Sequence, residues 1–496
     1  MKINYKYSDN TFQTQIEYVF HIFEYLLGID FQRDSKSILS ITYGKKEPTN
    51  LNSNYHIHIH QSDQLFNKTN YSYGSSLPDL PLVHLNLKKY EMLNTKKFTS
   101  STLPIIYPKN KFCDLKIKNT ESGKLLLINF DLIASIFFML TRYEEYISDS
   151  SRLDKNGRFP AVESVAYKEK FLSRPIVNEY IELLWEIIQY FDLGYNRKKI
   201  WGDNNFGVFL THDVDVIQKY TALSNLFNPI YTNLKNRKFQ RVTDNIKNFF
   251  LSSSDYKRDP YWTFDYMINL EKKYNFKSTF FFLVHNRHKY DGDYNFDSKE
   301  IQKLIYKLIE NDIEIGLHLS YDSFDKYDLM KNQIKYFKNC LSRSNLGVRQ
   351  HYLRFDVKNT WEYQNKNNIL YDTSLSYADR SGFRNGICHP FQVYSLTSEK
   401  KLDLWEIPLN VMEATLKRKN YMNLSINKAY EYTTTLIDSV KLYNGVFTFL
   451  WHNNNFSGEW IEWNELYKKI LKYIDDKNGI GLTGREIINK INDREQ

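Results

Sequence analysis

Residues 206–215 read FGVFLTHDVD and join a short buried-strand pattern to a cluster of reactive side chains. The apolar run 208–210 is long enough for one strand, and THDVD follows it at once. On an extended chain Asp213 and Asp215 point to the same face. Two like charges repel there unless a cation or a substrate proton lies between them. The pair therefore indicates a metal ligand beside a general base, or else a strand end that caps the next helix.

From this stretch onward, short apolar runs alternate with helical patterns. Such alternation predicts a parallel sheet with right-handed crossovers, and about seven units fit a closed or nearly closed barrel. An open doubly wound sheet is the structural alternative. No glycine-rich loop follows the first run, so a nucleotide phosphate cradle is not expected there. The runs are residues 208–210, 279–284, 313–317, 348–353, 404–407, 446–451 and 480–482, and helical patterns cover 262–274, 299–311 and 328–342.

The first 200 residues have another rhythm and predict a smaller α+β domain (1–200) ahead of the barrel (201–496). Helices are expected at about 18–28, 131–146 and 176–191, and strands at 37–43 and 55–60. The strand at 55–60 reads YHIHIH and places three imidazoles on one face. An edge strand with that face in solvent is preferred over a metal site.

Composition sets the class of protein. With 496 residues, 42% hydrophobic and 25% charged, the chain is an ordinary globular protein of two or more domains, not a disordered chain or a long coiled coil. The net charge of +9 is spread along the chain and does not call for nucleic acid. The aromatic fraction of 16% fits either codon bias or a carbohydrate-facing surface.

The three cysteines are odd in number and far apart, which argues against a disulfide framework. No CxxC pair is present for a zinc ribbon. The N-terminus does not read as a signal peptide. The longest apolar run, residues 132–140, is about half of the roughly 20 residues that a membrane helix needs. We therefore expect a soluble cytoplasmic protein without a membrane span.

Polar side chains follow several of the predicted strands. The third run continues as GLHLSYD (316–322), the fourth contains RQHYLR (349–354), and the sixth ends in LWHN (450–453). Together with THDVD, four strand ends supply Asp or His. Barrels of this type carry their chemistry at the C-terminal ends of the strands, so we expect these side chains to meet in one active site.

These motifs, in this order, resemble those of the NodB-type polysaccharide deacetylases over roughly residues 206–489. The resemblance implies an irregular (β/α)7 TIM-like barrel, a metal-dependent amidase activity and a bacterial source, with carbohydrate as the partner. THDVD, RQHYLR and LWHN are typical of a subgroup found with bacterial surface-polysaccharide genes. That subgroup also carries an N-terminal domain of unknown role, which the run FFMLTRYEEY (137–146) resembles.

The resemblance also implies roles for the motif residues. Asp213 corresponds to the general base, and Asp215 and His318 to metal ligands. The family usually has a second histidine four residues after the first, where this chain has Asp322. The third ligand is therefore either Asp322 or His351. Such a set suits a zinc site with an open position, and cobalt or nickel are compatible with it.

Two further roles follow from the same comparison. Arg349 or Arg354 corresponds to the arginine that orients the base, and His452 to the general acid that protonates the leaving amine. A carboxylate that keeps His452 charged is expected, with Asp372 or Asp379 in that role. His212 lies either beside the metal ligands or in the packed core.

The predicted function is a metal-dependent amide hydrolase that removes an N-acetyl group from an amino sugar or a surface-polysaccharide intermediate. One alternative is a barrel without catalysis that acts as a carbohydrate-binding or scaffold module. The other is an amidohydrolase for a non-sugar amide. The presence of both a base and an acid argues against a pure binding module.

Overall fold

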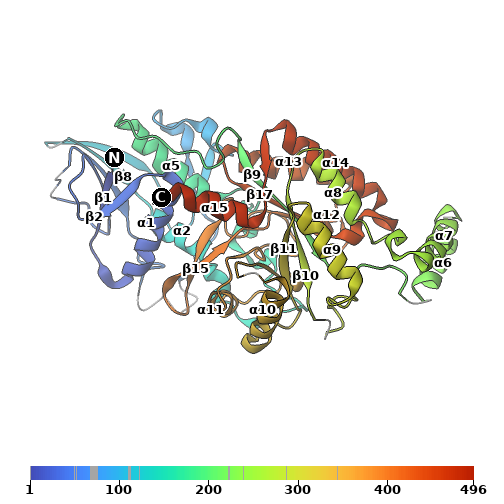
Figure 1. The fold of residues 1–496 in the computed structure, drawn as a ribbon. Helices are drawn as coiled ribbons and strands as arrows, with labels where there is room; N and C mark the ends of the chain where they lie inside the picture. The colour runs from blue at the N-terminus through green and yellow to red at the C-terminus, as the bar shows by residue number, and fades with distance from the viewer. Residues whose placement is uncertain are drawn as a thin grey trace.

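Two large β-sheets, each flanked by helices, organise the chain (Figure 1). The structure is a computed structural model that describes residues 2–49, 51, 53–67, 76–109, 113–121, 123–221, 224–237, 239–285, 288–342 and 344–495. The strands of the first sheet end at Ile128, and those of the second begin at Phe206. No helix in these ranges is long and apolar enough to cross a membrane.

The first sheet has six strands in the order β2-β1-β3-β4-β8-β7. All neighbours pair in parallel except the β7–β8 hairpin. The sheet is thus α/β in character, where α+β was expected, because strand runs alone do not reveal the direction of pairing. The elements are β1 (Lys2–Tyr7), α1 (Gln13–Leu27), β2 (Asp30–Arg33), β3 (Leu39–Gly44), β4 (Tyr55–His60), β5 (Val83–Asn86), β6 (Thr102–Ile105), β7 (Leu115–Thr120), β8 (Gly123–Ile128), α2 (Leu132–Leu140), α3 (Tyr143–Tyr146), α4 (Val165–Lys168) and α5 (Ile176–Tyr190).

Strand β4 is central and not an edge strand, so the expectation for its histidines is wrong. It lies between β3 and β8, and its residues His56 and His58 are buried. The Nδ1 atom of His58 lies 3.0 Å from Thr42 Oγ1. Burial, reinforced by the charge of His60, lowers the pKa of His58 to about 4. The imidazole is therefore held neutral inside the sheet.

Acidification is expected to weaken the fold through His58. Its folded-state pKa lies below the ordinary value of 6.5, so the unfolded chain takes up the proton first. The stabilisation is complete above pH 6.5 and is lost as the pH falls towards 4, which amounts to about 1–2 kcal/mol at pH 5. His58→Gln should flatten the fall of the melting temperature between about pH 7.5 and 5.

His84→Gln provides the matched control, because His84 is an exposed imidazole on β5 of the same region. This variant should keep the pH dependence of the unsubstituted protein. The prediction would be contradicted if the melting temperatures of the His58→Gln variant and of the unsubstituted protein fell equally across this pH range.

The second sheet has ten strands in the order β14-β15-β13-β12-β11-β10-β9-β17-β16, with β18 paired to β9. Its elements are β9 (Phe206–Val214), α6 (Ser224–Lys235), α7 (Phe239–Ser254), α8 (Phe264–Lys272), β10 (Ser278–Leu283), α9 (Lys299–Glu310), β11 (Glu314–Leu319), α10 (Tyr327–Leu341), β12 (Gly347–Gln350), α11 (Thr360–Lys366), β13 (Tyr371–Asp372), β14 (Phe391–Ser395), β15 (Lys400–Glu406), β16 (Val411–Met412), α12 (Glu413–Lys417), α13 (Ile426–Leu442), β17 (Val446–Leu450), α14 (Ile461–Asp476), β18 (Gly479–Gly481) and α15 (Gly484–Glu495).

This sheet is a parallel, curled half-barrel. Every pair in it is parallel except β14–β15 at one edge. Among the described residues no pairing joins the two ends, β14 and β16, so the sheet stays open where a seven-unit barrel was expected. Each of the seven predicted runs overlaps a strand, although residues 351–353 of the fourth run form a 3-10 turn after β12, and β13, β14 and β16 are additional. The parallel order brings the C-terminal ends of β9, β11, β12 and β17 to one edge.

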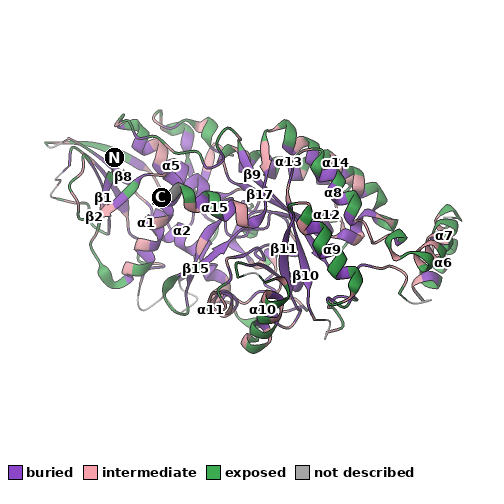
Figure 2. Cartoon of the chain, viewed as in Figure 1, coloured by how far each residue is buried: buried purple, intermediate pink, exposed green. Residues whose placement is uncertain are grey.

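Helices α6 and α7 form a hairpin that projects away from the rest of the molecule (Figure 1). The hairpin is inserted between β9 and α8 and is mostly exposed (Figure 2). It is tied to the chain after β9 by Lys219, whose Nζ donates to Asn245 Oδ1 at 2.7 Å.

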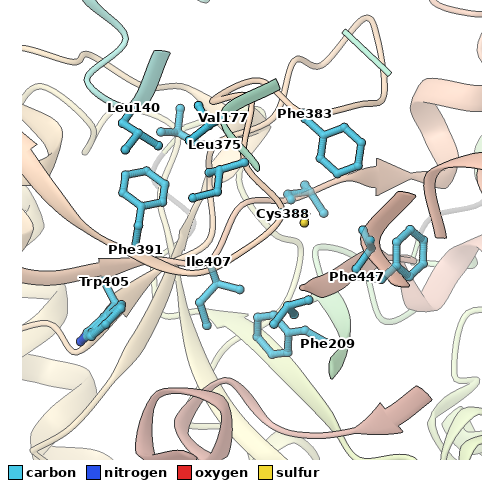
Figure 3. Close-up of a cluster of buried hydrophobic side chains, with 14 of the residues drawn as sticks. Leu140, Val177, Phe209, Leu375, Phe383, Cys388, Phe391, Trp405, Ile407 and Phe447 are labelled. Atoms are coloured by element: carbon cyan, nitrogen blue, oxygen red, sulfur yellow. The ribbon is translucent and has the colours of Figure 1, made fainter. Parts of the chain in front are cut away.

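One continuous hydrophobic core runs through both sheets (Figure 2). The strands of the second sheet are buried along their whole length near its centre, as in β9, β10 and β11. The half of the chain that carries the first sheet and the half that carries the second meet in the region shown in Figure 3. There Leu140 and Val177, from α2 and α5 of the first half, lie beside Leu375 and Phe391 of the second half. Removing this shared apolar surface from water ties the halves together.

A buried ion network reinforces the same boundary. Arg142 separates α2 from α3 with a φ of 53°, which explains why one predicted helix is two. Its Nε donates to Glu145 Oε1 at 2.8 Å and its Nη2 to Tyr377 Oη at 2.7 Å. Arg384 Nε donates to the same Glu145 oxygen at 2.9 Å. Arg142 is thus paired with Glu144 and Glu145 of its own half, and Arg384 of the second half pairs with Glu145 as well.

Candidate metal-dependent active site

The alternation of side chains along β9 sorts its polar residues by face. Asp213 points to the inside of the curled sheet with Asp215, whereas His212 points outward. His212 is fully buried, with its Nδ1 at 2.7 Å from Trp451 O and its Nε2 at 2.8 Å from Glu271 Oε1. Of the two interpretations of His212, the structure shows the packed ring.

Asp215, His318 and His351 come together at the C-terminal edge of the sheet. Their ligand atoms all lie within 4.8 Å of one another, and they form the one such group of three or more among the described residues. Asp215 Oδ1 lies 3.3 Å from His318 Nε2 and 3.5 Å from His351 Nε2. The three side chains come from the C-terminal ends of β9, β11 and β12, which the parallel sheet brings to one edge with β10 between β9 and β11.

The far nitrogen of each imidazole is fixed by an acceptor. His318 Nδ1 lies 2.9 Å from the backbone oxygen of Arg349, and His351 Nδ1 lies 3.2 Å from Asp291 Oδ1. A nitrogen facing such an oxygen carries the proton, so in the neutral ring Nε2 keeps its lone pair. Metal-bound histidines are held by this type of outer contact. Both Nε2 atoms are thus oriented as ligands towards Asp215.

The donor set fits a divalent metal. Asp215 Oδ1 is buried and has no hydrogen-bond donor among the described residues, which is costly for a carboxylate unless a cation is near. Burial raises the pKa of Asp215, but the His351 and His318 imidazoles hold it well below its usual range. One carboxylate oxygen and two imidazoles match a catalytic zinc site with an open position, and cobalt and nickel also accept this set.

Asp322 lies outside this cluster. Its carboxylate is 3.4 Å from Arg354 Nη1 and 3.5 Å from Lys326 Nζ. The guanidinium of Arg354 also stacks on Tyr321 at 4.0 Å and donates to its backbone oxygen. Of the two candidates for the third ligand, His351 is the one beside Asp215 and His318.

Arg349 lies beside the candidate base. It is fully buried, and its Nε is 3.5 Å from Asp213 Oδ1. Its Nη2 donates to Thr211 Oγ1 at 2.9 Å, which fixes the guanidinium plane. The other Asp213 oxygen, Oδ2, is 3.5 Å from His318 Nε2. Of the two candidate arginines, Arg349 contacts Asp213, whereas Arg354 pairs with Asp322.

His452 reaches the cluster from the end of β17. Its Nε2 is 3.6 Å from Asp215 Oδ2, and its Nδ1 is 2.6 Å from Glu413 Oε1. Burial lowers the pKa of His452, but the Glu413 carboxylate raises it to about 9. The carboxylate that keeps His452 charged is therefore Glu413, and the expectation of Asp372 or Asp379 is wrong.

Asp372 and Asp379 have other partners. Asp372 accepts hydrogen bonds from Gln364 and from Ser374 at 3.0 and 2.6 Å. Asp379 accepts one from the backbone nitrogen of Ala161 at 3.1 Å.

Sequence reasoning missed Asp291 and Glu413 for different reasons. Asp291 lies in a polar loop after β10, where nothing singles out one of several charged residues. Glu413 follows β16, a strand of two residues that is too short to show a pattern. The apolar residues Leu409, Val411 and Met412 just before Glu413 were the available signal.

The cluster opens into a pocket of about 100 Å³. Asp213, Asp215, His318, His351 and His452 line it. The rest of its lining comes from Arg158, Tyr352, Leu353, Met412, Ala414, Arg418, Tyr421 and Leu450. The pocket therefore combines carboxylate and imidazole groups with aromatic, apolar and guanidinium groups.

One family model and several solved structures match parts of the chain. Residues 5–192 match the model of a family described as being of unknown function, DUF7033. Among curated proteins, none matches the chain. Solved structures similar to part of it include a candidate polysaccharide deacetylase from Mycobacterium smegmatis, with 11% identity and a TM-score of 0.38, covering 59% of this chain and 93% of that one.

Two further solved structures have similar scores. A protein of Pseudomonas aeruginosa PAO1, described as a candidate polysaccharide deacetylase, has 13% identity and a TM-score of 0.38, covering 60% of this chain and 95% of that one. The Puue allantoinase has 12% identity and a TM-score of 0.39, covering 60% and 94%. At these values the function of this chain has to be argued from its own residues.

Proposed function

We propose that the chain is a metal-dependent amide hydrolase that removes an N-acetyl group from an amino sugar or a surface-polysaccharide intermediate. The observation that carries this proposal is that a carboxylate and an imidazole, Asp213 and His452, adjoin the same three-ligand cluster. Hydrolysis of an amide needs a base for water and an acid for the leaving amine. A binding module needs neither.

The cluster of Asp215, His318 and His351 is the proposed metal site. A divalent metal bound there would supply a Lewis acid and lower the pKa of a water molecule. Asp213 would act as the base for a water molecule at this site, since its Oδ2 lies next to His318. Arg349 lies beside the opposite oxygen of the Asp213 carboxylate, which keeps this carboxylate oriented.

His452 is the proposed general acid. Its pairing with Glu413 keeps the proton on the ring until the reaction needs it. Addition of water to the carbonyl carbon gives a tetrahedral intermediate, and transfer of the His452 proton to nitrogen allows the carbon–nitrogen bond to break. The products are acetate and a free amine, and Asp213 returns its proton to regenerate the acid.

The size of the pocket supports a small acyl group. Its volume of about 100 Å³ suits an acetamido group better than a long acyl chain. Tyr352 and Tyr421 in its wall offer ring faces for a sugar. The carbohydrate class also follows the motif resemblance of residues 206–489.

Metal analysis combined with acetate release tests the proposal. Protein purified without chelator should contain about one divalent metal per chain and release acetate from N-acetylated sugar oligomers. Chelation should abolish release, and zinc, cobalt or nickel should restore it. If the protein binds metal and hydrolyses non-sugar amides but releases no acetate from N-acetylated sugars, the substrate is a non-sugar amide. If the protein contains no metal and hydrolyses no amide under any addition, the binding module is the remaining function.

A further inference from the structure

The turn that presents His351 has an unfavourable backbone. Tyr352 and Leu353, the next two residues, both adopt the left-handed conformation, with φ values of 60° and 54°. Side chains with a Cβ atom rarely adopt it, and consecutive examples persist only where the surroundings enforce them. This turn carries the third ligand of the proposed metal site, so its conformation decides where His351 Nε2 lies.

A residue from the other half of the chain holds this turn. Arg158, in the region that precedes α4, donates from Nη1 to the backbone oxygen of Tyr352 at 2.9 Å. Its Nε donates to Asp154 Oδ2 at 2.9 Å, and its Nη2 donates to Tyr421 Oη at 3.2 Å. The side chain is buried, so these contacts replace water.

The segment around Arg158 is shaped to deliver it. Asp154 accepts hydrogen bonds from the backbone nitrogens of Asn156 and Arg158 at 2.8 and 3.0 Å, and Gly157 completes the turn with a φ of 72°. Asn156 Oδ1 in turn accepts from Tyr321 Oη at 3.2 Å. Residues 154–158 thus lie against the chain after β11 and after β12, the two strands that carry the histidine ligands.

We propose that the segment 154–158 is part of the active site and that Arg158 is a positioning residue for the metal ligand His351. Arg158 fixes the carbonyl of Tyr352 and so stabilises the left-handed turn. His351 Nε2 then stays 3.5 Å from Asp215 Oδ1. This inference rests on the metal site of the proposed function, but not on the substrate. It gives the region of unknown function a task in the chemistry of the other half.

Cobalt titration of the metal-free full-length protein, followed by visible absorption, tests the inference. Arg158→Met keeps the aliphatic stem but cannot donate, and it should weaken cobalt binding about 10-fold, as loss of an outer support typically does. Arg158→Lys, which can still donate a hydrogen bond, should lose less cobalt affinity than Arg158→Met. Asp154 is 28% exposed and stays hydrated, so we expect these variants to fold. Arg152→Ala, an exposed arginine six positions away along the same segment, should bind cobalt like the unsubstituted protein.

A second substitution separates positioning from a general structural effect. Glycine adopts the left-handed conformation without strain, so Tyr352→Gly should make the turn less dependent on Arg158. In that background Arg158→Met should cost less than about 3-fold in cobalt affinity. The role of Arg158 would be overturned if Arg158→Met weakened cobalt binding equally with and without Tyr352→Gly, or if Arg158→Met by itself left the cobalt affinity unchanged. Neither result would affect the metal site itself. Failure of the unsubstituted protein to bind cobalt would overturn the metal site itself.

Discussion

Replacing Asp213 by asparagine is expected to lower turnover by about 10²–10⁴-fold, the usual contribution of a general base. Asparagine keeps the shape of the side chain but cannot take a proton from water. Asp213 is not among the three clustered ligands, so the variant should retain its metal. Acetate release and elemental analysis on the same preparation measure both quantities.

Asp203→Asn is the matched control, because Asp203 is an exposed carboxylate shortly before β9. It should leave turnover and metal content unchanged. If Asp213→Asn lost its metal together with its activity, Asp213 would be a ligand and the base would have to be sought elsewhere. If the Asp213→Asn variant remained fully active, the proposed mechanism would fail.

Replacing His318 by alanine is expected to abolish metal binding under ordinary conditions. The substitution removes one of three ligands and leaves only Asp215 and His351. Loss of an outer support costs about 10–100-fold in metal affinity, so loss of a ligand should exceed 100-fold. Elemental analysis and cobalt titration of the full-length variant measure this directly.

The matched control for this variant is His84→Ala, which removes an exposed imidazole outside the cluster. The His318→Ala variant should also be inactive even with excess zinc, whereas the control should behave like the unsubstituted protein. A His318→Ala variant that retained full metal content would overturn the ligand assignment. Comparison of His351→Ala with Asp322→Ala follows the same logic, and only the former should lower the metal affinity.

The strands of the second half could be predicted because they are buried on both faces and read as continuous apolar runs. Each of the seven predicted runs overlaps a strand, and the fourth continues as a 3-10 turn at residues 351–353. The additional strands β13 and β16 have two residues each, which is below any readable period. The position of β4 could not be foreseen, because alternation of His with Ile looks the same at an edge and at the centre of a sheet.

The candidate site followed the same division. Asp213, Asp215, His318 and His452 stand directly after predicted strands, and parallel pairing brings such positions to one edge. Glu413 and Asp291 act through contacts between segments 39 and 60 residues apart in the chain. Arg158 is 194 residues from the backbone oxygen that it contacts. Contacts over such separations depend on the complete fold and leave no local pattern.

The ion network at Arg142 also determines when the first half can finish folding during synthesis. Arg142 donates to the backbone of Arg384, which lies 242 residues later. A ribosome adding about 5–20 residues per second needs roughly 10–50 s to cover that stretch. Throughout this interval Arg142 and Glu145 lack their distant partners, and the apolar side chains of α2 lack the cover shown in Figure 3. The half that is translated first therefore cannot complete its packing until residues up to about Phe391 have been made, and it should depend on chaperones during that interval.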